Sequence, residues 1–586
     1  MAAVGWTQIW WALVLFALFL LSASFLKLRA WTRGTKGAPL DFSPDRSAGR
    51  LPILVVGAGP TGLTVATVLA SYGVPVRIVE KKARLSQTSK ATNLMRRNQE
   101  LMYALGLQER LEQVSGKMSR LMVHAYGKCF GPRTMHLNET PFQDVLLCGQ
   151  HRVEHALADR LATLGVEVDF SVSVTGLHQH EDHVYVDFTN GGHSTREKYS
   201  YVVGCDGYAG VTREYTKLNF QPEKTGVAIR QVDCHLKWNR LSNTDQMWLF
   251  YFDHGFAAVI PLPKDTWRVL FVEPKAAFPS REPTLEEMQF KLREVSQDGT
   301  ASLSRPQWFS YTDLTMGIGP GMVDGRIVLA GDVCNPILPN GGQGMNTGIG
   351  DAFNLAWKLA AIHQHGGPKS LLQTYEQERH ELRSNLQKAQ VNSLHYTTLS
   401  TPAIMQGIFR LLAEPILNAG GEYAMARVFS ELSIDTRKSA LSLEEVRSGG
   451  IKAGDRALDA NVVHDSTPMK LYSIIYQGAW TLLAFTGVRV DHQGLSVTTS
   501  ALDRTGRSGL RTFVVSSSAV VESRNTVLYD LDEEAHRVYE ISKPTLILIR
   551  PDGYVGARVK AHIHGKLASY LDLWVPDASQ GFRRDV

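Results

Sequence analysis

Residues 53–62 read Ile-Leu-Val-Val-Gly-Ala-Gly-Pro-Thr-Gly, a short apolar run that passes directly into a glycine-rich turn. A short apolar run bounded by a turn is typical of a buried parallel strand. Apolar residues then recur with helical spacing as far as Gly73, and a second apolar run, residues 76–79, ends at Glu80. This order of strand, turn, helix and strand predicts the first unit of a dinucleotide-binding α/β domain.

Each residue of the turn has a physical task in such a unit. Gly57 permits the tight turn, Gly59 lets a pyrophosphate approach the backbone, and Gly62 lets the helix pack closely on the strand. The N–H groups and the positive dipole end at the start of the helix face the phosphates. Glu80 can accept hydrogen bonds from an adenosine ribose. We therefore predict nucleotide binding, although this motif alone does not choose between FAD and NAD.

The composition is that of a globular protein with more than one domain. The chain has 586 residues, of which 44% are hydrophobic and 20% are charged, and a formal net charge of only +5. That charge is too weak to favour nucleic acid as a partner. The five cysteines are widely spaced and contain no Cys-X-X-Cys pair, so we expect reduced, mostly buried thiols and neither a disulfide framework nor a metal site.

The N-terminus predicts a membrane anchor. Residues 1–26 carry no charged side chain, and residues 9–26 are almost continuously apolar. Eighteen residues rise about 27 Å as a helix, close to the thickness of a bilayer core. Basic residues follow directly, which favours a cytosolic body on a single-pass anchor, with the endoplasmic reticulum as one candidate membrane.

We therefore expect an anchor over residues 1–27, with membrane contact through residues 4–26, and a linker over residues 28–50. The alternative is a cleaved signal peptide with its cleavage site at Ser22-Ala23-Ser24. The absence of basic residues before the apolar run disfavours it.

Two later segments decide the cofactor. Residues 326–332 form an apolar run that ends in Gly-Asp, and they lead into Pro-Asn-Gly-Gly-Gln-Gly-Met-Asn-Thr-Gly at 339–348 and a helix over 351–363. Residues 201–207 read Tyr-Val-Val-Gly-Cys-Asp-Gly. In this order, over residues 51–440, the motifs resemble those of the class A flavoprotein monooxygenases, the group of 4-hydroxybenzoate hydroxylase and phenol hydroxylase.

The resemblance implies an FAD-binding, Rossmann-like α/β domain of the GR2 type, interleaved with a mixed-sheet substrate domain whose strands lie mainly in 220–320. It implies tight, non-covalent FAD and a transient NADPH or NADH, because no second dinucleotide motif occurs. Asp332 is implied to bind the ribityl chain, and the helix after the glycine-rich turn is implied to point its N-terminus at the flavin. The cofactor-binding residues implied by the motifs are Gly57, Gly59, Pro60, Thr61, Gly62, Glu80, Lys81, Arg97, Gln150, Arg152, Asp206, Asp332, Gly342, Gly344, Met345 and Asn346.

The chain departs from the family pattern at two places. Asp332-Val333-Cys334-Asn335 stands where the family commonly has Asp-Ala-Ala-His, and Lys90 stands where arginine is usual. No catalytic residue is therefore assigned by analogy. Phe250, Phe256 and Pro339 are candidates for the substrate pocket, with His124 and Tyr126 as further candidates, although most aromatic residues of 220–320 are expected in the sheet core.

Residues 450–586 resemble the thioredoxin-like tail of the phenol hydroxylase branch. Pro544, before an apolar run, resembles the cis-proline of that fold. No cysteine follows Cys334, so thiol–disulfide chemistry is excluded from this tail. We expect a packing role or a homodimer contact instead.

The implied reaction uses NAD(P)H to reduce the flavin and O2 to form a flavin C4a-hydroperoxide, which hydroxylates an aromatic or phenolic substrate. A phenolic polyketide of secondary metabolism is a candidate substrate. A flavin epoxidase or a Baeyer–Villiger monooxygenase on the same scaffold remains open. Two alternatives of another class are a non-catalytic flavoprotein that recruits partners at a membrane and a structural membrane protein. The complete nucleotide motif disfavours both.

Overall fold

A computed structural model describes residues 51–575, except 89–90, 126, 242–243, 339–341, most of 399–428, 447–448, 489–491, 506–508 and 520–522. The expected anchor and linker, residues 1–27 and 28–50, lie outside the described residues, as do Lys90, Tyr126 and Pro339. Within the described ranges, none of the helices combines the length and the hydropathy that a membrane span requires.

A six-stranded sheet carries the predicted nucleotide motif. Its strand order is β18-β19-β12-β1-β2-β8, and all neighbours are parallel except the edge strand β18. The first strand is fully buried at Ile53, Leu54 and Val55, as a parallel strand covered on both faces should be. The strands are β1 (Ile53–Val56), β2 (Val76–Glu80), β8 (Val168–Phe170), β12 (Tyr201–Gly204), β18 (Val323–Asp324) and β19 (Ile327–Leu329).

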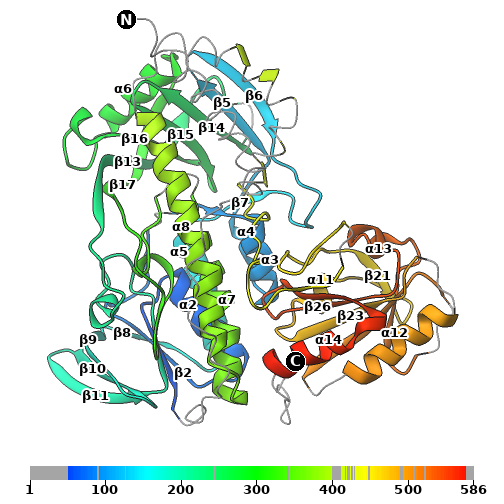
Figure 1. Ribbon diagram of the computed structural model, residues 1–586. Coiled ribbons are helices and arrows are strands. Elements are labelled where there is room, and N and C mark those ends of the chain that lie inside the picture. The colour runs from blue at the N-terminus through cyan, green and yellow to red at the C-terminus, as the bar shows by residue number, and fades with distance from the viewer. Residues whose placement is uncertain are drawn as a thin grey trace, which may run out of the picture.

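Helices pack on this sheet and link it to the rest of the chain. Helix α2 (Pro60–Ser71) packs against α5 (Gln150–Thr163) and α7 (Gly344–His365), and α7 packs against the long α8 (Ser370–Thr398). In Figure 1, α8 runs from the nucleotide-binding part toward the upper sheet. Smaller elements complete this part: β3 (Asn93–Leu94), α3 (Arg96–Ala104), α4 (Gln108–Val114), β4 (Gly116–Met118), β7 (Val145–Leu147), β9 (Ser173–Gln179), β10 (Val184–Asn190) and β11 (His193–Tyr199).

A second sheet of seven strands lies at the far end of α8 (Figure 1). Five of its strands fall within 220–320 as predicted, whereas β5 and β6 come from an earlier segment. Helix α6 (Leu285–Ser296), which begins with a capping box at Thr284 and Glu287, covers one face. In spatial order the strands are β17 (Ser302–Met316), β13 (Glu223–Lys237), β16 (Thr266–Pro274), β15 (Gly255–Leu262), β14 (Gln246–Phe252), β5 (Arg120–Ala125) and β6 (Lys128–Thr134).

The C-terminal unit is built on an eight-stranded sheet, ordered β20-β27-β26-β23-β24-β25-β21-β22 (Figure 1). Strand β23 and helix α12 lead into β24, which is parallel to β23, while β26 and β27 form an antiparallel hairpin beside β23. This is the order expected for a thioredoxin-like unit, but its first strand, β20, begins before residue 450. The elements are β20 (Leu443–Glu444), β21 (Asn461–His464), β22 (Thr467–Lys470), α11 (Tyr472–Ile475), β23 (Trp480–Phe485), α12 (His492–Thr505), β24 (Leu510–Ser516), β25 (Thr526–Tyr529), α13 (Glu534–Val538), β26 (Thr545–Ile549), β27 (Val555–Lys560) and α14 (Gly565–Trp574).

The structure does not have the expected cis peptide bond before Pro544. Among the described residues the cis peptide bond is Gly131–Pro132, so the bond before Pro544 is trans. The trans form is the more stable one for an X–Pro bond, and this unit has no dithiol for a cis-proline to lie against. Four of the five cysteines are buried, as expected, and within the described residues all five are free thiols.

Candidate functional site

The three glycine-containing motifs meet around Thr61. A Cβ atom added at Gly57 would lie 2.7 Å from the carbonyl oxygen of Cys205, so the first turn lies directly against the middle motif. A Cβ atom at Gly331 would lie 2.8 Å from Oγ1 of Thr61, and one at Gly348 would collide with the same hydroxyl. Glycine at these positions therefore lets the start of α2, the Gly-Asp turn and the first turns of α7 approach one another.

The site leaves room where a cofactor backbone is expected. A Cβ atom added at Gly59 or at Gly344 would meet no protein atom within 4 Å. Gly59 precedes α2 and Gln343 precedes α7, and neither helix N-terminus is capped by a side chain. Helix N–H groups without a cap favour an anionic or polar ligand. These residues fit FAD, with a pyrophosphate at α2 and the flavin at α7.

The predicted ribose ligand is held in place beside the first turn. Glu80 accepts hydrogen bonds from the backbone N–H groups of Ala58, at 2.9 Å, and Lys82, at 3.0 Å. The neighbouring Lys81 is exposed. The carboxylate of Glu80 therefore lies at the end of β2 beside the first turn, where an adenosine ribose is predicted to bind.

The N-terminus of α5 brings Gln150 to a second acid. The amide of Gln150 donates to Glu154 at 2.8 Å, and burial, helped by the charge of Glu80, raises the pKa of Glu154 to about 7. Arg152 instead donates to the carbonyl of Val114 at 2.6 Å, at the end of α4. Gln150 and Arg152 are therefore already engaged with protein groups, and their contact with the cofactor remains a prediction.

Asp206 and Asn346 use their side chains to build the site. Asp206 accepts from the backbone N–H and the hydroxyl of Thr212, at 3.0 and 2.5 Å, and burial raises its pKa. Asn346 accepts from the N–H of Met95 at 2.8 Å and donates to the carbonyls of Asn93, at 2.8 Å, and Gly342, at 3.0 Å. Both side chains shape the backbone around the site, and their direct contacts with the cofactor remain a prediction.

Asp332 lies in a turn, Gly331–Val333, whose backbone is held on several sides. The N–H of Ala330 donates to the carbonyl of Gly204 at 2.9 Å. Arg213 donates to the carbonyl of Val333, and Arg383 donates to that of Asn335, each at 2.9 Å. Asp332 itself is only partly buried, as a carboxylate that binds ribityl hydroxyls must be.

Arg97 lies in a buried contact between α3 and the C-terminal unit. Its guanidinium donates to Glu100 at 2.9 Å, to the hydroxyl of Tyr476 at 2.6 Å and to the carbonyl of Asp552 at 2.7 Å. Glu100 in turn accepts from Arg456 at 2.8 Å. Three of these partners belong to the C-terminal unit, so Arg97 lies in the contact between α3 and that unit. Its contact with the cofactor remains a prediction.

The structure corrects the expectation that Phe250 lines the substrate pocket. Side chains of β14 alternate between the two faces of the sheet, and Phe250 packs in the core that contains Met288 and Leu292 of α6. Phe256 lies on the opposite face, against Leu338, which follows the Gly-Asp turn, and Leu394 of α8. Phe256 therefore remains a pocket candidate, whereas Phe250 faces away from the Gly-Asp turn. His124 stacks on Phe250, with ring centroids 4.9 Å apart, and burial lowers its pKa to about 4.

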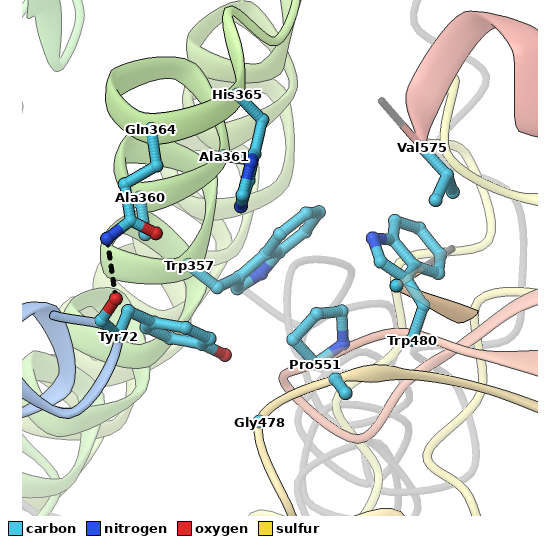
Figure 2. A pocket seen from close by; sticks show the side chains of 12 residues that line it. Tyr72, Trp357, Ala360, Ala361, Gln364, His365, Gly478, Trp480, Pro551 and Val575 are labelled. Atoms are coloured by element: carbon cyan, nitrogen blue, oxygen red, sulfur yellow. Dashed lines mark hydrogen bonds between the residues drawn. The ribbon is translucent and has the colours of Figure 1, made fainter. Parts of the chain in front are cut away.

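A groove between α7 and the C-terminal unit is separate from this site. Trp357 and Trp480 face each other across it, and Tyr72 and Val575 lie at its sides (Figure 2). The amide of Gln364 donates to the carbonyl of Tyr72 at 2.6 Å. The groove shares no lining residue with the predicted cofactor site, so we assign it no part in the chemistry.

Comparison with known proteins identifies the family. A model of the family described as "FAD binding domain" matches residues 50–389. The chain belongs to this family. It is 31% identical to a rifampicin monooxygenase of Streptomyces venezuelae over 459 residues, which is 75% of this chain and 90% of that protein. It is 26% identical to a pentachlorophenol 4-monooxygenase of Sphingobium chlorophenolicum over 449 residues, 75% of this chain and 81% of that protein.

The fold of this FAD-dependent monooxygenase is shared by solved structures. The OxyS anhydrotetracycline hydroxylase of Streptomyces rimosus matches with a TM-score of 0.67 and 23% identity, over 89% of this chain and 99% of that one. At this identity the likeness concerns the fold alone. The match extends through most of the C-terminal unit, which makes that unit part of the shared architecture.

Sequence reasoning missed one buried cluster at the site. Asp351 of α7 pairs with Arg379 and Arg383 of α8, and all three side chains are at least 95% buried. A signal was available, because Asp351 is the sole acidic residue in the helix that follows the glycine-rich turn. Its partners could not be named without knowing that α8 folds back along α7.

Proposed function

We propose that this FAD-dependent monooxygenase hydroxylates an aromatic, phenolic substrate of the polyketide type, with NAD(P)H as the reductant and O2 as the source of oxygen. The observation that carries the proposal is the meeting of the Gly57, Gly331 and Gly344 segments beside an apolar face of the seven-stranded sheet. Bound FAD supplies the redox chemistry. The names of the relatives, which concern rifampicin, pentachlorophenol and anhydrotetracycline, support an aromatic substrate.

The substrate face fits a flat, apolar ring. Phe256, Leu270 and Val391 are partly buried and pack against a cluster that includes Leu338 and Leu394. Such a surface excludes water, which protects reactive intermediates from side reactions. A phenolic ring bound here would stack on apolar side chains and lie beside the turn that carries Asp332.

One polar group on α8 is suited to orient a substrate hydroxyl. Gln387 lies one turn before Val391, is 97% buried, and its Oε1 atom has no hydrogen-bond partner within the described part of the chain. An unpaired buried acceptor costs free energy until a donor reaches it. We infer that a phenolic hydroxyl of the substrate is that donor.

Two further parts of the proposal concern placement. Residues 1–27 anchor the protein in a membrane with its body on the cytosolic side, a proposal supported by the uncharged run and the basic residues that follow it. The C-terminal unit offers a homodimer contact, for which its exposed Leu531 and Leu573 are candidates. Carbonate extraction of membranes and light scattering of the purified protein test these two points.

The experiment that tests the function is a reaction with a panel of phenolic polyketides, NADPH and O2, followed by mass spectrometry of the products. We expect a hydroxylated ring. An epoxide or a ring-expanded lactone would establish the epoxidase or the Baeyer–Villiger alternative. NAD(P)H oxidation without an oxygenated product from any member of the panel would favour the non-catalytic flavoprotein.

A further inference from the structure

Asp351 is a fully buried carboxylate beside the Gly-Asp turn. It lies in the third turn of α7, and its side chain has no exposed surface. A buried charge is costly unless it is paired and hydrogen-bonded. The partners of Asp351 therefore show what this carboxylate holds together.

Three groups surround the carboxylate. Arg379 donates to Oδ1 at 2.6 Å, Arg383 donates to Oδ2 at 2.7 Å, and the backbone N–H of Gly331 donates to Oδ2 at 3.1 Å. Burial by itself would raise the pKa of Asp351, but the two arginines outweigh it and lower that pKa. The carboxylate therefore stays ionised and accepts from all three donors.

Asp351 and its two arginines also hold the backbone on either side of Asp332 and at the start of α7. Arg383 also donates to the carbonyl of Asn335 at 2.9 Å, while Asp351 itself holds the N–H of Gly331. Arg379 also donates to the carbonyl of Thr347 at 3.0 Å, in the first turn of α7. The cluster thus fixes both ends of the segment 331–335 and the start of the helix that faces the flavin.

We propose that Asp351 is a positioning residue for FAD, which holds Asp332 and the first turn of α7 in the geometry that the ribityl chain and the flavin ring require. This inference rests on the proposed cofactor site. Asp351 does not touch the cofactor itself. It acts through the Gly331 N–H and through Arg383 and Arg379. The adenosine half of FAD, at Gly59 and Glu80, lies on other elements and should be insensitive to it.

A matched control is available in the same pair of helices. Glu378 of α8 is also buried and pairs with two cations, Lys358 at 3.1 Å and Arg550 at 2.7 Å. Within the described part of the chain its hydrogen bonds go to Asn354, Lys358, Ser439 and Arg550, and none goes to the segment 331–335. Asp351→Asn and Glu378→Gln therefore each remove the charge of a buried carboxylate that pairs with two cations, but only the first change reaches the Gly-Asp turn.

The test compares FAD and ADP binding to the apoproteins by isothermal titration calorimetry, together with their melting temperatures. Both variants should melt lower than the wild type. Asp351→Asn should weaken FAD binding at least tenfold, which is about 1.4 kcal/mol, and leave ADP binding within about twofold. Glu378→Gln should leave the affinities for FAD and ADP close to those of the wild type.

A second variant covers the case in which Asp351→Asn does not fold. Arg383→Lys keeps a positive charge near Asp351 but cannot also reach the Asn335 carbonyl as a guanidinium does. It should weaken FAD binding severalfold and spare ADP binding. Wild-type FAD affinity in a folded variant of either kind, or equal losses of FAD and ADP affinity, would overturn the inference. A wild-type apoprotein that binds no FAD would instead reject the proposed site.

Discussion

Asp332 is the residue whose loss bears most directly on flavin binding. Its turn is held by Arg213 and Arg383, so removing its side chain should leave the turn in place. Charge-assisted hydrogen bonds contribute roughly 1.5–3 kcal/mol each. Asp332→Ala should therefore weaken FAD binding by about one to two decades. Fluorescence titration of the apoprotein measures this, and excess FAD should restore activity.

The alternative for Asp332 is a purely structural role in its turn. In that case the Asp332→Ala apoprotein would melt at a lower temperature than the wild type, and added FAD would not rescue it. An unchanged FAD affinity with a lowered melting temperature would show that the ribityl site lies elsewhere.

Glu431 is a second single residue with a testable effect: it should make the stability of the protein depend on pH. It is buried, and Asn98 donates to it at 2.9 Å. Burial, only partly offset by Arg379, raises the pKa of Glu431 to about 7. The folded state therefore binds a proton that the unfolded state releases near pH 4.5, so stability is lost as the pH rises toward 7.

Glu431→Gln mimics the protonated form and should remove this loss. The variant should gain stability relative to the wild type between pH 5 and pH 8, by about 1–3 kcal/mol at the upper end. Urea denaturation at several pH values measures the difference. A difference that does not change with pH would show that Glu431 is ionised throughout.

At the scale of elements, two glycines at the start of α2 have different roles, one in cofactor binding and the other in folding. A Cβ atom at Gly59 meets no protein atom within 4 Å, whereas one at Gly62 would collide with the backbone carbonyl of Gly57. Gly59→Val should therefore melt like the wild type as apoprotein and retain no flavin, because its side chain occupies the approach of the pyrophosphate. Gly62→Ala should lower the melting temperature of the apoprotein itself. Equal melting losses in the two variants would contradict this division.

Elements were predictable where their signal is local. The turn from Gly57 to Gly62, the end of β2 at Glu80 and the Gly-Asp turn at Asp332 each follow from a few adjacent residues, and the structure places them together. The side of β14 on which Phe250 lies was not predictable, because both faces of that sheet are apolar. The partner of Arg97 was not predictable either, since Asp552 is 455 residues away in the chain.

At the scale of the whole molecule, the C-terminal unit is joined to the nucleotide-binding part through buried charges. Arg550 donates to Glu378 of α8 at 2.7 and 2.9 Å, and Asp552 accepts from Trp357 of α7 at 3.0 Å. The side chains of Arg550, Glu378 and Asp552 are at least 98% buried. A unit without redox cysteines therefore packs on α7 and α8, the first of which begins at the predicted flavin site.

Removing one member of this network should lower the free energy of unfolding. Arg550→Met leaves buried carboxylates short of a partner, which typically costs about 3–5 kcal/mol. Arg196 pairs with Asp187 but is 57% exposed, so Arg196→Met is a control that should change the free energy of unfolding far less. Chemical denaturation of both variants measures the difference, and equal losses would mean that the contact between the two parts contributes little.

The most direct test of the account is the origin of the oxygen atom in the product. The FAD-reconstituted protein would be incubated with NADPH, a phenolic polyketide substrate and ¹⁸O₂, and the product analysed by mass spectrometry. We expect one ¹⁸O atom per product molecule and no product in the absence of NADPH or O2. A product whose new oxygen comes from water, or one that forms without O2, would contradict the assignment as a monooxygenase.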